Sequence, residues 1–216
     1  MKSECRGYVF LTSLFCLLLA VAISSTGCAN PAKAKADHVK KGEAYLKEGK
    51  FQEASLEFRN AIQIDGNLAA AHWGLARAYE GLQRFPEMID SLRKTLQLDK
   101  TNQDARIKLG NYYLAASMGR QELIAEADRL AKEALERDAN SIEGHILMGS
   151  IFFARHDKDK AFAELNRAIE LDPLSLLMNM TPALNFYLAR EHDRAVEQLR
   201  RVIDMEPNFV AARSVM

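Results

Sequence analysis

The chain has 216 residues, enough for one large domain or two small ones. Its 29 basic and 29 acidic residues balance, so the composition predicts no net attraction to nucleic acid or to anionic lipid. The charges are interspersed, and only 11 glycines and 5 prolines interrupt the chain, which indicates helices with solvated faces.

The N-terminal segment has the features of an export signal. Lys2 and Arg6 precede residues 8–23, a run of sixteen residues without a charge. A membrane-spanning helix needs about 20 apolar residues, whereas the apolar part of a secretory signal needs about 7–15. The sequence therefore predicts a signal peptide over residues 1–27.

A cysteine follows this segment directly. Thr26 and Gly27 precede Cys28, and small residues before a cysteine in this place resemble a bacterial lipobox. The resemblance implies that Cys28 is lipidated, becomes the new N-terminus and anchors the chain in a membrane of the bacterial envelope through palmitate and further acyl chains. Ala29 follows the cysteine directly. In similar lipoproteins, a residue other than Asp in this place implies anchoring in the outer membrane, with the fold facing the periplasm. A protein secreted to the periplasm after cleavage near Ala22, and an uncleaved anchor, remain the alternatives.

Residues 28–37 are predicted to join this anchor to the fold. The segment contains Pro31, small residues and lysines, and it offers nothing to a core. We therefore expect a tether, which spans about 30 Å when fully extended. A tether of that length holds the fold close to the membrane.

The rest of the chain repeats one pattern five times. Near-copies of an amphipathic helix begin at Ala54, Met88, Ala127, Ala161 and Ala195, separated by 34, 39, 34 and 34 residues. Another helix is predicted before each copy, with a small residue at Gly42, Ala76, Gly110, Gly149 and Ala183. An aromatic residue lies three places later, at Tyr45, Tyr79, Tyr113, Phe152 and Phe186. These spacings place each set on one stripe of a helix.

The pattern resembles the tetratricopeptide repeat, a helix–turn–helix unit of 34 residues. The resemblance implies an all-α, right-handed superhelical solenoid of about five units over residues 35–209, in which stacking buries stripes that no unit can bury alone. The units are 35–68, 69–102, 103–141, 142–175 and 176–209. The sequence from Phe51 to Tyr79 also resembles tetratricopeptide lipoproteins of bacterial exosortase (PEP-CTERM) sorting systems.

The third unit is five residues longer than the others, and it gains them within residues 114–126. The inserted sequence remains helical in character. We therefore expect one or both of its helices to extend by about a turn and to form a bump on the solenoid. A partner-specific feature and neutral drift both explain such a bump.

The C-terminal end lacks the polar capping helix that usually closes such an array. Residues 210–216 indicate the start of a further, truncated helix, which is too short to be stable alone. Val196, Leu199 and Ile203 are then only partly covered. This predicts either a surface for self-association or a truncated gene product.

Nothing in the sequence indicates catalysis. His38, His72 and His145 occupy equivalent places on different units, at least about one repeat apart, so they cannot share a metal ion. Each second helix ends in an acidic residue, for which turn chemistry is the favoured interpretation; these are Asp65, Asp99, Asp138, Asp172 and Glu206. Metalloprotease, nucleotide-binding and hydrolase motifs do not occur in the sequence. We expect no enzymatic activity, no cofactor and no metal site.

The resemblance implies a concave surface built from the first helices, suited to an extended or helical peptide with apolar anchors. Its lining residues are Val39, Glu43, Leu46, Trp73, Arg77, Glu80, Ile107, Asn111, Leu114, Ile146, Ser150, Phe153, Met180, Leu184 and Tyr187. About half of them are expected to pack between units, and Trp73 is the expected hot spot. The basic clamp of chaperone-binding tetratricopeptide domains is absent, because Val39, Glu43, Trp73 and Arg77 occupy its places.

Two functions follow from these observations. The first is a membrane-anchored scaffold or adaptor that binds other proteins or peptides in an envelope assembly, secretion, pilus, polysaccharide or protein-sorting system. The alternative is a truncated tetratricopeptide domain of a larger regulatory or signalling protein.

Overall fold

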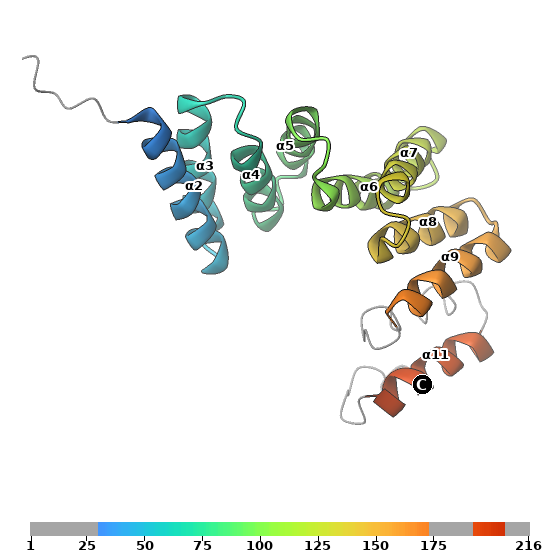
Figure 1. Ribbon diagram of the computed structural model, residues 1–216. Coiled ribbons are helices and arrows are strands. Elements are labelled where there is room, and N and C mark those ends of the chain that lie inside the picture. Colours follow the sequence, from blue (N-terminus) through green and yellow to red (C-terminus); the bar gives the residue numbers. More distant parts are fainter. Residues whose placement is uncertain (1–29, 173–191, 206–216) are drawn as a thin grey trace, which may run out of the picture.

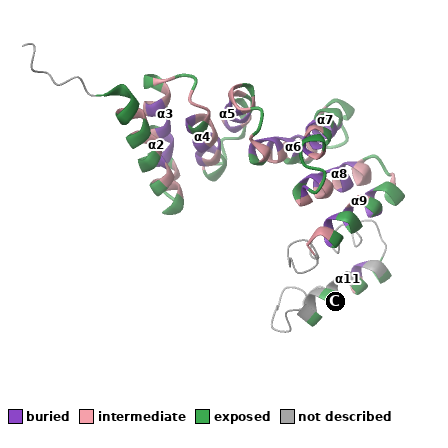
Figure 2. Cartoon of the chain, viewed as in Figure 1, coloured by how far each residue is buried: buried purple, intermediate pink, exposed green. Residues whose placement is uncertain are grey.

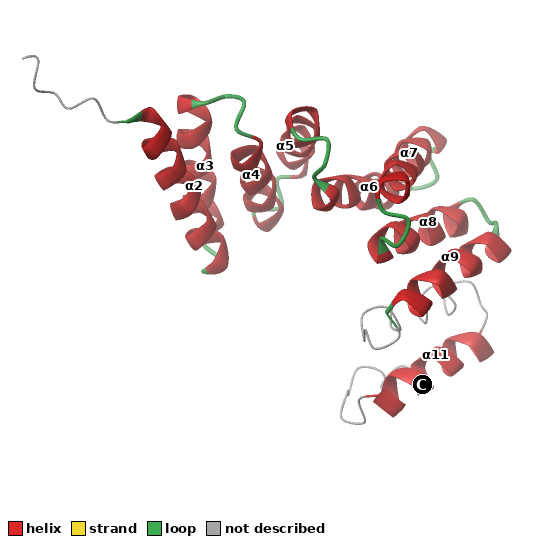
Figure 3. Ribbon diagram, in the orientation of Figure 1, coloured by secondary structure: helices red, strands yellow, loops and turns green. Residues whose placement is uncertain are grey.

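The computed structural model describes residues 30–172 and 192–205, which form nine α-helices and no strand. This confirms the all-α prediction (Figures 1 and 3). The helices are α2 (Pro31–Lys47), α3 (Phe51–Ile64), α4 (Ala69–Gly81), α5 (Phe85–Leu98), α6 (Gln103–Ser117), α7 (Gln121–Arg137), α8 (Ile142–Ala154), α9 (Lys158–Leu171) and α11 (His192–Met205).

The helices follow one another as hairpins. Turns of three residues join α2 to α3, α4 to α5, α6 to α7 and α8 to α9, whereas turns of four residues join one hairpin to the next. The hairpins are stacked in an arch, with α4 and α6 toward its inside and α5 and α7 along its outside (Figure 1). Buried residues lie where helices face one another, and the outer surfaces are exposed (Figure 2).

Glycine allows the close approach of the helices in the first two units. Phe58 of α3 is fully buried, and Cβ atoms built at Gly42 of α2 and Gly74 of α4 would lie 2.8 and 2.3 Å from its ring. Only residues without a side chain fit there. The later units use the same device, because a Cβ at Gly149 would lie 2.8 Å from Leu165.

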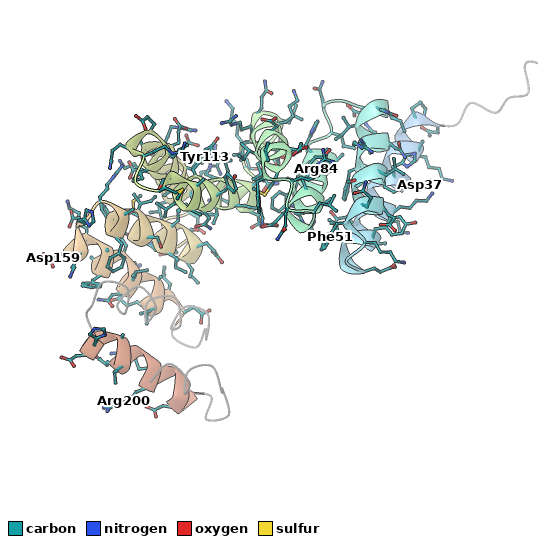
Figure 4. The ribbon with its side chains drawn as sticks, turned by 180° about the vertical axis from the view of Figure 1, so that it is seen from behind. Asp37, Phe51, Arg84, Tyr113, Asp159 and Arg200 are labelled. Atoms are coloured by element: carbon teal, nitrogen blue, oxygen red, sulfur yellow. The ribbon has the colours of Figure 1, made fainter. Side chains whose placement is uncertain are left out.

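The repeated aromatic residues pack where the sequence pattern predicts. Tyr79 and Tyr113 are buried, and Tyr45 and Phe152 are half-buried against the same core. The hydroxyl of Tyr113 on α6 accepts a hydrogen bond of 2.8 Å from Nε of Arg93 on α5. The Tyr113 side chain, labelled in Figure 4, therefore joins two successive units.

The acidic residues at the ends of the second helices are turn residues, as expected. One Oδ of the aspartate accepts a hydrogen bond from the backbone N–H two residues later at Asp65, Asp99 and Asp138, with distances of 3.0, 2.8 and 2.9 Å. Asp172 caps the C-terminus of α9, and Glu206 lies outside the described residues.

Both helices of the third unit are extended. Helix α6 has 15 residues where α4 and α8 have 13, and α7 has 17 where α5 and α9 have 14. The turn between them keeps its three residues, so the five additional residues all enter the helices. At the projecting end, Met118 has a positive φ of 45° and a side chain that is 92% exposed.

The N-terminal segment differs from the expected tether. Helix α2 begins at Pro31, so residues 31–37 are helical. Asn30 is the N-cap and its side chain accepts a hydrogen bond of 3.0 Å from the N–H of Ala32. Proline at the first position of a helix has no N–H left unsatisfied and a suitable φ. Lys35 then joins the fold through a 2.5 Å ion pair with Asp65.

No helix among the described residues has both the length and the apolar character needed to cross a lipid bilayer. The predicted signal peptide, Cys28 and residues 210–216 lie outside the described ranges.

Candidate functional site

The predicted lining residues that the structure describes come from the first helices of four hairpins. They lie on α2, α4, α6 and α8, and all are half-buried except Glu80 and Asn111, which are exposed. This intermediate burial fits a face that both packs and remains accessible. Met180, Leu184 and Tyr187 lie outside the described residues.

Ion pairs connect successive first helices along this face. Nη1 of Arg77 on α4 donates to both carboxylate oxygens of Glu43 on α2, at 2.9 and 3.0 Å. One unit further, Nζ of Lys108 on α6 donates to both oxygens of Glu80 on α4, at 2.7 and 2.8 Å. The partners are partly exposed, so each pair contributes at most about 1 kcal/mol to stability. Lys108 is not among the predicted lining residues, although its place beside Ile107 on a first helix is a signal that could have predicted it.

Trp73 is part of this network. The guanidinium of Arg77 lies 5.7 Å from the centroid of the Trp73 ring, in a cation–π contact. The half-buried Trp73 side chain also packs against the core. Its removal would therefore disturb packing as well as a binding face, and the hot-spot role of Trp73 stays a prediction.

Several other lining residues contribute to the packing of the helices. Val39, Leu46, Ile107 and Leu114 pack against the main core. Phe153 packs edge-to-face on Phe162 of α9, with 5.3 Å between ring centroids. The area of these side chains that a partner can contact is therefore smaller than the full set of predicted residues suggests.

One hollow opens on this face between α6 and α8. Its volume is about 220 Å³, and Ile107, Lys108 and Asn111 of α6 face Ser141 and Glu143 at the start of α8 across it. Gln103 and Asp104 complete its lining. The hollow presents one half-buried apolar side chain, two amides, a hydroxyl and charges of both signs, which suits a peptide backbone with a mixed set of side chains.

His38, His72 and His145 each have a structural partner. Nδ1 of His38 lies 2.6 Å from Oε2 of Glu57, and His145 and Glu164 repeat this pair at the same distance. His72 lies 3.0 Å from the carbonyl oxygen of Gly66. Within residues 30–172 and 192–205, no group of three or more His, Cys, Asp or Glu side chains is placed to hold a metal ion.

Known proteins share this architecture. Residues 42–83 match the family model described as TPR repeat, the tetratricopeptide repeat. The crystal structure of YrrB, a TPR protein with an unusual peptide-binding site, superimposes with a TM-score of 0.61 over 86% of this chain and 97% of its own, at 19% identity. Pseudomonas aeruginosa pilF superimposes with a TM-score of 0.67 over 84% and 81% of the two chains, at 18% identity. The fold is a tetratricopeptide-repeat solenoid.

Curated relatives match over parts of their length. Lipopolysaccharide assembly protein B of Escherichia coli K12 is 26% identical over 133 residues, which are 61% of this chain and 34% of that protein. Sperm-associated antigen 1 of Mus musculus is 32% identical over 114 residues, which are 51% and 13%. The chain thus spans about a third or less of the length of these relatives. Solenoids of this kind are as a rule non-catalytic and bind proteins on their extended surfaces.

Proposed function

We propose that this tetratricopeptide solenoid is a non-catalytic scaffold that binds a peptide segment of another protein on the inner face formed by α4, α6 and α8. The observation that carries the proposal is the hollow between α6 and α8, where Asn111 is exposed beside half-buried Ile107. Ion pairs join α2 to α4 and α4 to α6 along the same face.

A variant that fills the hollow tests this role. Asn111→Trp places a large side chain on an exposed position of α6, and Glu122→Trp places the same side chain on an exposed position of the outer helix α7. Proteins that co-purify with the wild type from envelope extract are expected to be lost with Asn111→Trp and kept with Glu122→Trp. Equal recovery with both variants would contradict binding on the inner face.

We further propose that the protein acts in the bacterial envelope, anchored through lipidated Cys28. The sequence before Cys28 and the similarity to lipopolysaccharide assembly protein B of Escherichia coli support this proposal. Metabolic labelling with radioactive palmitate should mark the wild type and leave Cys28→Ala unlabelled. Equal labelling of the two proteins would remove the anchor from the account.

A further inference from the structure

A second hollow lies between the second and third units. It has a volume of about 640 Å³, within the range of binding sites for small ligands and peptides. Residues of α5, of the turn that follows it, of α6 and of α7 line it. We call it the basic trough, and its lining is Arg93, Leu96, Gln97, Lys100, Arg106, Leu109, Arg129, Leu130, Glu133, Glu136 and Arg137.

The charged residues that line this trough are mostly basic. Five of its lining residues are basic and two are acidic, on a chain whose total charge is zero. The side chains of Lys100 and Arg137 are exposed and form no hydrogen bond or ion pair with the described residues. Two cations at the trough are therefore available to an anionic ligand.

Arg106 provides a fixed charge at its base. Its side chain is only 3% exposed, in the place where the first, second and fourth units have a histidine. The guanidinium donates to Glu133, to Gln103 and to the carbonyl oxygen of Lys100. A guanidinium has five N–H groups, so two of them have no partner among the described residues.

The field of these cations already acts on a neighbouring carboxylate. Hydrogen bonds from Thr101 are the main reason why the pKa of Asp99 lies below its ordinary value, and the positive charges of Arg106 and Arg137 lower it further. The trough thus favours the ionised form of a carboxyl group beside it.

The spacing of the cations favours an extended ligand over a compact ion. Arg129 and Arg137 are eight residues apart on α7, which corresponds to about 12 Å along the helix. Lys100 lies beyond the end of α5, in another element. Arg129 is already ion-paired with Glu126 and Glu133, so the carboxylates of a ligand are expected on Lys100 and Arg137, which lie on different elements.

The basic trough also has apolar lining residues. Leu109 and Leu130 are buried, whereas Leu96 is half-buried and lines the same trough. We propose that the basic trough binds a short acidic peptide segment of a partner protein, with glutamate or aspartate side chains on Lys100, Arg106 and Arg137 and one apolar side chain against Leu96. This site is separate from the inner-face hollow, which shares no residue with it.

A charge reversal in the full chain, solubilised in non-ionic detergent, tests the proposal. The probes are fluorescein-labelled hexapeptides that contain glutamate and leucine in every arrangement, with binding followed by fluorescence anisotropy. The double variant Lys100→Glu, Arg137→Glu is expected to bind the tightest-binding peptide at least about tenfold more weakly than the wild type does. Lys40→Glu with Lys47→Glu makes the same change in net charge at exposed positions of α2 and is expected to change the affinity less than twofold.

Changes in the peptide give a second readout that does not depend on the folding of a variant. Replacing glutamate by glutamine in the peptide should abolish its binding to the wild-type protein, and replacing leucine by serine should weaken that binding. Millimolar inorganic phosphate should not displace the original peptide. The proposal is overturned if no peptide binds the wild type, if both charge reversals act alike, or if phosphate displaces the peptide. It is also overturned if phosphatidylglycerol vesicles bind in a manner dependent on Lys100 and Arg137 while the peptides do not. None of these outcomes involves Asn111, so the inner-face proposal is tested independently.

Discussion

At the scale of the residue, contacts at glycine determine how closely the helices pack. The small–aromatic spacing predicted which residues lie on the packed stripe, and Gly42 and Tyr113 do so. The pattern could not predict Gly74, whose close contact with Phe58 depends on how the second hairpin is placed against the first. A contact between units is set by the geometry of stacking, which a pattern within one unit does not contain.

Gly74→Ala should destabilise the protein. Its new Cβ would lie 2.3 Å from the fully buried Phe58 ring, so the ring or α4 must shift. The expected loss is about 1–2 kcal/mol, because overpacking exceeds the gain in helix propensity. Gly66→Ala is the control, since its Cβ would meet only the carbonyl of Ile62 at 3.9 Å, and it should change stability by less than about 0.5 kcal/mol. Urea unfolding measures both, and equal losses would contradict the packing explanation.

Asp99 should make the solenoid sensitive to acid. Its pKa in the folded protein lies below the ordinary 3.8, mainly because Thr101 donates hydrogen bonds to the ionised carboxylate. The resulting stabilisation is complete above pH 3.8 and is lost as the pH falls through the lower, folded-state pKa. Asp99→Asn should therefore reduce the fall in the unfolding midpoint between pH 5 and pH 2. Asp37→Asn, at an exposed position of α2, serves as the control, and an unchanged acid response in Asp99→Asn would refute the assignment.

At the scale of the element, the positions of the described helices could be predicted from the sequence, except for the start of the first one. Offsets of 34 residues predicted the hairpins, and the offset of 39 predicted the longer α6 and α7. The tether was wrong for residues 31–37, although Asn30 before Pro31 is a typical start of a helix. A lack of apolar residues does not exclude a helix, because a helix can begin with a polar, alanine-rich turn before its buried stripe.

Two substitutions in the turns within hairpins should change stability in opposite directions. Gly49 and Gln83 occupy the same middle position, with φ of 72° and 56°. A side chain costs about 1 kcal/mol in this region, and a Cβ at Gly49 would meet nothing within 4 Å. Gly49→Ala should therefore destabilise by about 1 kcal/mol, and Gln83→Gly should stabilise by up to about 1 kcal/mol. Thermal unfolding of both variants checks this, and a loss of equal size in Gln83→Gly would show that conformational strain is not the cause.

At the scale of the whole molecule, stacking brings together side chains that no unit contains alone. The location of the predicted lining residues on the first helices could be predicted from the repeat, whereas their role in binding stays a prediction. Their ion pairs, the hollow between α6 and α8 and the basic trough were not predictable, because each joins two units and depends on the rotation between them. Function is thus expected at the junctions between hairpins rather than within one hairpin.

Site-specific photo-cross-linking in intact cells tests the central claim that the inner face binds a partner protein. A photoreactive phenylalanine derivative replaces Asn111 on α6 in one strain and Glu122 on α7 in another. The account predicts a discrete cross-linked adduct from position 111 and none of the same mass from position 122. An adduct from position 122 alone, or the same adduct from both positions, would contradict it.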